Sequence, residues 1–137
     1  MRSKFALFFA VVLFVSAVEI EIGHAQDDQA VKADVPFDFY AGNQKMSAGA
    51  YFLKFDFGVN NVEIMDADGH GMFLLRSDIE DTKTRTAALV FDHLGDSYFL
   101  KTLEAPGVEI NFAVKDAEKK LALNASPTPV VVAANLR

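Results

Sequence analysis

Short segments of alternating apolar and polar residues, separated by turn-forming residues, run through the chain from Val31 onward. In the clearest segment, residues 31–40, every second residue is apolar, which is the period of a half-buried strand. Pro36 interrupts this segment. Because proline cannot donate a ladder hydrogen bond, we expect the strand to lie at a sheet edge or to break there.

The same signals predict six or seven further strands along the chain. They cover residues 50–57, 62–64, 72–75, 86–93, 97–103, 108–112 and 130–133. Asp68-Gly69 tolerates the positive φ of a tight turn and predicts a hairpin, whereas the charge-rich residues 76–85 predict an exposed connection. Seven or eight short strands with tight turns predict an all-β antiparallel barrel or sandwich, and the pattern leaves open which of the two forms.

One short helix is predicted near the C-terminus, within residues 114–124. Acidic residues precede basic ones in this segment, an order that the helix dipole favours. Its apolar stripe, formed by Val114, Ala117 and Leu121, is thin. We therefore expect the helix to depend on docking against the sheet.

The N-terminal residues 1–25 have the pattern of a signal peptide. Arg2 and Lys4 form a basic start, an apolar run follows over residues 5–18, and small residues precede the cleavage position after Ala25. The apolar run of 14 residues is shorter than the roughly 20 that a membrane-spanning helix needs. Cleavage is therefore favoured over membrane anchoring, and a periplasmic or extracellular location is expected.

Cleavage would leave a single domain over residues 26–137, beginning with a flexible leader at residues 26–30. Glu19 and Glu21 are unusual so close to a cleavage site, which leaves open an uncleaved interfacial anchor. The chain has no cysteine, so a lipidated cysteine and disulfides are excluded and stability has to come from the apolar core.

The charge balance excludes one class of partner. The chain has 13 basic and 19 acidic residues, for a net charge of −6, and the acidic residues are dispersed. Nucleic-acid binding relies on clustered lysine and arginine, so no nucleic acid is expected as a partner. No transmembrane segment is expected after signal cleavage.

Three segments carry a resemblance to a known group of proteins. They are Val-Pro-Phe-Asp-Phe at residues 35–39, Ala-Gly-Ala-Tyr at residues 48–51, and the segment 91–100, which begins Phe-Asp-His-Leu-Gly. The chain resembles small secreted β-rich bacterial proteins that are abundant in acidobacterial genomes, over most of residues 31–104. These are strand and turn motifs, so the resemblance implies a fold and contributes no catalytic residue. Ser47 departs from the group, which commonly has proline there.

Two acidic clusters are candidate metal sites. Asp66, Asp68 and His70 alternate across a glycine-containing turn and offer oxygen and nitrogen ligands for a divalent cation such as calcium. A solvated turn is the favoured interpretation, because the complete EF-hand loop is absent. Asp78, Glu80 and Asp81 form a second cluster. A calcium site shared by the two clusters would require their loops to meet in space. No other cofactor is predicted.

No catalytic residue is predicted, and the protein is not expected to be an enzyme. Asp92 and His93 are adjacent in a strand, so their side chains should face opposite sides and not pair. No Gly-x-Ser-x-Gly elbow or cysteine nucleophile accompanies the histidines, and no spacing selects a carboxylate pair of the kind that glycosidases use.

Tyr40 and Phe52 are out of phase with their strands and are candidate ligand-binding residues, with core capping as the alternative. The function expected from these features is a non-catalytic binding or structural module of the cell envelope. The sequence does not identify its partner, and both an envelope protein and a small apolar ligand fit this expectation. A carrier that holds a small apolar ligand inside a barrel is the first alternative. A polysaccharide-directed hydrolase is the second.

Overall fold

The computed structural model describes residues 29–56, 58, 60–113 and 115–136. The signal peptide predicted over residues 1–25 lies outside these residues. The strands and the helix within the described residues are β1 (Gln29–Val35), β2 (Phe39–Ala41), β3 (Gln44–Met46), β4 (Gly49–Phe55), β5 (Asn61–Asp66), β6 (Gly71–Asp81), β7 (Ala87–Leu94), β8 (Ser97–Ala105), β9 (Val108–Phe112), α1 (Asp116–Ala122) and β10 (Thr128–Leu136).

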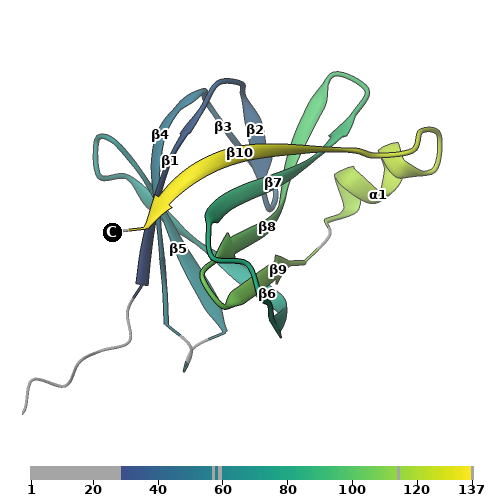
Figure 1. Ribbon diagram of the computed structural model, residues 1–137. Helices are drawn as coiled ribbons and strands as arrows, with labels where there is room; N and C mark the ends of the chain where they lie inside the picture. Colours follow the sequence, from purple (N-terminus) through teal and green to yellow (C-terminus); the bar gives the residue numbers. More distant parts are fainter. Residues whose placement is uncertain (1–28, 57, 59, 114, 137) are drawn as a thin grey trace, which may run out of the picture.

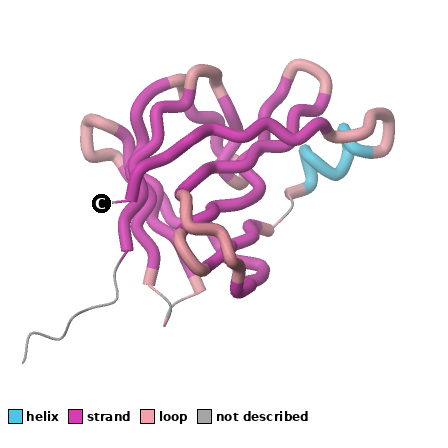
Figure 2. The backbone as a smooth tube through the Cα atoms, viewed as in Figure 1, coloured by secondary structure: helices cyan, strands magenta, loops and turns pink. Residues whose placement is uncertain are grey.

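Eight strands close into an antiparallel barrel (Figure 1), which decides between barrel and sandwich. Around the barrel the order is β1, β4, β5, β6, β9, β8, β7 and β10, and β10 pairs with β1 to complete the ring. Two connections join strands that are not neighbours in the ring. β9 and β8 lie between β6 and β7, and β8 and β7 lie between β9 and β10. The second connection contains α1, which lies outside the barrel wall (Figure 2).

The predicted strand over residues 31–40 is broken at Pro36. After the break, β2 and β3 form a hairpin instead of extending β1. Tyr40 of β2 pairs in parallel with Phe99 of β8. Phe39 is 1 % exposed and its ring contacts core aromatic rings, so the hairpin places an aromatic side chain inside the barrel.

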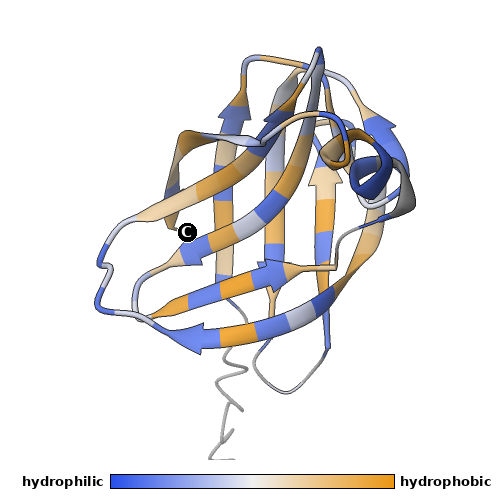
Figure 3. Ribbon diagram, turned by 90° about the vertical axis from the view of Figure 1, so that its right-hand side faces the viewer, coloured by the Kyte–Doolittle hydropathy of each residue, from blue (hydrophilic) through white to orange (hydrophobic). Residues whose placement is uncertain are grey.

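Inward-facing apolar side chains form the core of the barrel. The largest fully buried ones are Phe39, Phe91, Leu53, Ile64, Leu89, Leu103, Ile110, Val31 and Val62. The alternation of hydrophobic and hydrophilic residues along the strands is visible in Figure 3. An eight-stranded barrel is just wide enough for such side chains to fill, so this packing does not favour the carrier alternative.

Several predicted boundaries were wrong. Residues 76–81 were predicted to be part of an exposed connection, but they belong to β6 and pair with β9. An antiparallel strand tolerates this much charge because one of its faces meets water. The short polar strand β3 was missed, and β1 starts at Gln29, so residues 29 and 30 belong to a strand. Residues 26–28 of the predicted leader lie outside the described residues.

The helix predicted within residues 114–124 is confirmed as α1, but the side chain that it buries was not foreseen. Glu118 is 8 % exposed, whereas Leu121 of the predicted apolar stripe is 40 % exposed. The side chains of Val114 and Ala117 lie outside what the structure describes. The helix therefore docks through a carboxyl group.

Candidate functional site

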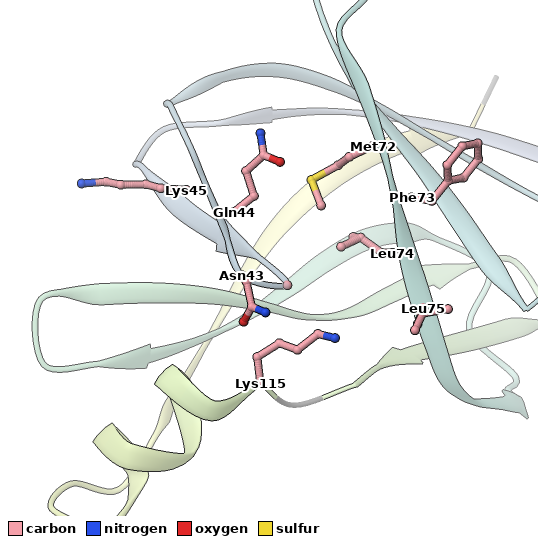
Figure 4. Close-up of a pocket in the computed structure, with 9 residues that line it drawn as sticks. Asn43, Gln44, Lys45, Met72, Phe73, Leu74, Leu75 and Lys115 are labelled. Carbon is pink, nitrogen blue, oxygen red and sulfur yellow. The ribbon is translucent and has the colours of Figure 1, made fainter.

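A groove opens in the barrel wall between the β2–β3 hairpin and the first half of β6 (Figure 4). It encloses about 660 Å³, a volume typical of ligand sites. The residues that line this β3–β6 groove are Gly42, Asn43, Gln44, Lys45, Met72, Phe73, Leu74, Leu75 and Lys115. Met72 and Leu74 point toward the hairpin, whereas Phe73 points away from it (Figure 4).

The groove exists because β9 ends before it has covered the whole edge of β6. Phe112, the last residue of β9, is opposite Arg76, so within the described chain residues 71–75 pair with no strand other than β5. Beyond the end of β9, the neighbour of β8 is β2, and β3 is the outer strand of that hairpin. Gly42 permits the tight hairpin turn with φ +62°, and a Cβ atom there would lie 3.5 Å from Leu74 Cδ2.

The groove is locally basic in an acidic protein. Lys45 is exposed on β3, and Lys115 is half-buried just before α1. Among the described residues neither lysine has an ion-pair partner, and none of the nine lining residues is acidic. Asn43 and Gln44 add amide groups. Lys115 extends toward the groove, whereas the Lys45 side chain extends outward from β3 at its rim (Figure 4). The groove thus combines one cation inside and one at the rim with amide groups and the apolar Met72.

The predicted metal ligands are brought together at the β5–β6 turn, where ligand atoms of Asp66, Asp68 and His70 lie within 4.8 Å of one another. Asp66 Oδ1 accepts hydrogen bonds from the backbone N–H groups of Asp68 at 3.0 Å and His70 at 2.9 Å. The bond from the His70 backbone, followed by that from Asp68, lowers the pKa of Asp66. These contacts form an Asx turn, which accounts for the cluster without a metal.

The second acidic cluster does not meet the first. Asp78, Glu80 and Asp81 lie in the second half of β6, whereas the Asp66–His70 turn precedes its first residue. The condition for a calcium site shared by the two clusters, that they meet in space, is therefore not fulfilled. Asp66 and Asp68 line a hollow of about 390 Å³, whereas Asp78 and Glu80 do not, so these four carboxylates do not share one cleft.

Tyr40 and Phe52, the predicted ligand-binding pair, have separate surroundings. The Tyr40 ring stacks on Phe99 at 5.2 Å. Phe52 is on β4, where Lys32 Nζ lies 5.6 Å from the centre of its ring. Neither residue lines the β3–β6 groove, so the structure does not combine them into one patch.

Asp92 and His93 face opposite sides of β7, as predicted. The His93 ring stacks on Tyr98 at 4.2 Å. Asp92 is 6 % exposed, shares a hydrogen bond with Glu118 of α1, and lies 3.7 Å from Lys101 Nζ through its Oδ1.

This buried carboxyl pair was not found from the sequence, because no spacing rule connects a strand residue to a distant helix residue. Burial, followed by the hydrogen bond and the charge of Asp92, raises the pKa of Glu118 to about 7, and Lys101 opposes this shift. A carboxyl–carboxyl hydrogen bond requires one proton between the two groups. The pair lies under α1 rather than in the groove, so it joins the helix to the barrel.

The chain matches no protein-family model, no curated protein and no solved structure. Among the residues that the structure describes, no helix is long and apolar enough to cross a membrane. A fold by itself does not define a function, so the groove and its charges carry the functional argument.

Proposed function

We propose that the protein is a non-catalytic binding module of the bacterial cell envelope, and that its β3–β6 groove takes a ligand that is anionic and in part apolar. The observation that carries this proposal is the presence of Lys45 and Lys115, both without ion-pair partners among the described residues, beside the apolar Met72 and Leu74. The envelope location is part of the proposal and is supported by the signal-peptide pattern of residues 1–25.

The charge distribution supports an anionic ligand at this place. The chain has a net charge of −6, so most of its surface repels anions. Lys115 at the groove and Lys45 at its rim reverse this locally, because none of the lining residues is acidic, and concave sites with walls of low dielectric focus such fields. Because salt screens partly exposed charges, binding should weaken as ionic strength rises.

The lining residues support binding rather than a reaction. Cationic groups, amides and apolar side chains are the components of a recognition site. The groove presents no histidine, carboxylate or hydroxyl side chain among its described lining residues, and these are the groups from which acid–base pairs and activated nucleophiles are commonly built.

The test is calorimetric titration of the purified protein with three probes: decanoate, a short peptide of alternating glutamate and valine, and the same peptide with lysine in place of glutamate. At least one anionic probe should bind, and the lysine peptide should not. K45E/K115E should weaken binding about tenfold or more. The matched control K83E/R85E introduces the same charge change at exposed residues outside the groove and should leave binding nearly unchanged.

Three results would refute the proposal. In the first, neither anionic probe binds. In the second, the lysine peptide binds as well as the glutamate peptide. In the third, K83E/R85E weakens binding as much as K45E/K115E does, which would indicate a general charge effect instead of a site.

A further inference from the structure

The walls of the β3–β6 groove are two strand edges. Residues 71–75 of β6 pair with β5 on one side and with no strand of the described chain on the other. Among the strands that the structure describes, β3 pairs with β2 alone. The pairings of β9 with β8 and β6 close the barrel. Beyond the end of β9, the edges of β6 and β3 that face each other have no partner strand among the described residues.

The hydrogen-bonding pattern identifies the backbone groups of β6 that face the groove. Asp66 N–H donates to the His70 carbonyl and Arg76 N–H donates to the Asn60 carbonyl, both at 2.9 Å. In an antiparallel ladder the bonded pairs alternate, so even-numbered residues of this stretch bond to β5. Odd-numbered residues present their N–H and C=O groups to the opposite side.

One further contact agrees with this assignment. The carbonyl of Leu75 accepts a hydrogen bond from Ala113 N–H at 3.4 Å, on the side away from β5. Phe73 is the next odd-numbered residue, and among the described residues its N–H and C=O groups have no backbone partner on that side. One peptide donor and one peptide acceptor therefore lie at the groove without a partner strand.

This edge lacks the features that usually prevent strand addition. Proteins protect exposed edges with charged residues, proline, bulges or a covering segment. Residues 71–75 of β6 contain neither charge nor proline, and Phe73 and Leu75 are 65 % and 63 % exposed on the outer face. A partner strand would cover part of this apolar surface as well as pair with the backbone.

On the basis of the proposed binding function, we infer that the ligand of the groove is an acidic polypeptide segment, which enters in extended form and pairs with the free edge of β6 at Phe73. Its inward side chains lie against Met72 and Leu74, and its outward side chains cover Phe73 and Leu75. Its carboxylates lie near Lys45 and Lys115. This is β-strand addition, in which backbone bonds give affinity and alternate side chains give specificity.

The inference is tested with the alternating glutamate–valine peptide and two N-methylated forms of it, one methylated at the glutamates and the other at the valines. A strand has alternate N–H groups on opposite edges, so one methylated form should lose about tenfold or more in affinity, while the other stays close to the parent peptide. The peptide should also slow hydrogen exchange of the Phe73 amide.

A matched pair of variants tests the protein side. F73P removes the N–H that faces the groove and leaves the bonds to β5 in place, because Phe73 does not donate to β5; proline is tolerated at strand edges. F73A keeps the N–H and removes only the ring. F73P should bind the peptide about three- to tenfold more weakly than F73A, the effect of one hydrogen bond.

The outcomes separate strand addition from the broader binding proposal. If both methylated peptides bind as well as the parent, and F73P binds the peptide as well as F73A does, strand addition is wrong. Decanoate binding that K45E/K115E weakens would then leave the proposed function in place with a small amphiphilic anion as ligand. If F73P does not fold, the binding of the methylated peptides and the hydrogen exchange of the Phe73 amide test strand addition on the unaltered protein.

Discussion

Single residues make the protein's stability depend on pH, and Glu118 is the clearest example. Its pKa is raised from 4.5 to about 7, first by burial and then by Asp92. Between these two values the folded protein holds a proton that the unfolded chain releases. The contribution of Glu118 to the free energy of unfolding is therefore fully present below about pH 4.5 and is lost as the pH rises through about 7.

We expect the free energy of unfolding to fall by about 1–2 kcal/mol from this group between about pH 5 and about pH 8. Glu118→Gln keeps a neutral hydrogen-bonding side chain next to Asp92, so its stability should vary less over the same range. Urea unfolding at both pH values measures the difference. Glu80→Gln, at an exposed position on β6, is the control and should retain the pH dependence of the unaltered protein.

Two phenylalanines show how one residue type has different consequences in this barrel. Phe39 is 1 % exposed and Phe73 is 65 % exposed. Phe39→Ala leaves a cavity inside the barrel and should lower the free energy of unfolding by about 3–5 kcal/mol. Phe73→Ala should change it by only about 0.5 kcal/mol. Equal losses in denaturant unfolding would contradict the placement of the β2–β3 hairpin.

Among the elements, β6 is paired differently along its length, and hydrogen exchange should reveal this. The amide of Leu74 bonds to β5, whereas that of Phe73 faces the groove. In the protein without ligand, the Phe73 amide should exchange faster than that of Leu74, because an amide hydrogen bonded within a ladder is protected. Slower exchange at Phe73 than at Leu74 would mean that the bonding register is reversed.

The elements also show how far the sequence could predict this structure. Strands with one buried face were found because their apolar residues alternate, and residues 108–112 were predicted with both boundaries correct. β3 was missed because neither Gln44 nor Lys45 is buried and it belongs to the sheet only through backbone pairing with β2. Local patterns indicate which residues are buried, but not which strand becomes the neighbour of another.

The candidate site was out of reach of sequence reasoning for the same reason. Asp66, Asp68 and His70 were correctly expected to lie together, because a short turn brings them into contact. The β3–β6 groove depends on where β9 ends relative to β6, which is a consequence of topology. Lys45 and Lys115 are distant in the sequence and become neighbours of one groove only in the folded barrel.

At the scale of the whole molecule, closure of the barrel depends on β10. This strand pairs with β7 along Thr128–Ala134 and with β1 through Val31, Lys32 and Ala33. The two ends of the described chain therefore meet at the last seam of the ring. With no cysteine in the chain, disulfides cannot hold this seam, so packing and ladder bonds alone keep the barrel closed.

Two neighbouring residues of β10 test this dependence. Val132 is 9 % exposed and Val131 is 65 % exposed. Val132→Asp buries an unpaired carboxylate in the core beneath β10 and should destabilise the protein by about 3 kcal/mol or more. Val131→Asp adds the same charge on the solvent face and should change stability by about 0.5 kcal/mol. Because the sheet is one ring, V132D should unfold the barrel cooperatively rather than release β10 alone. Thermal unfolding followed by circular dichroism distinguishes cooperative unfolding from release of β10 alone. A single transition at lower temperature supports cooperative closure. An early separate transition confined to β10 would show that the remaining strands are stable without it.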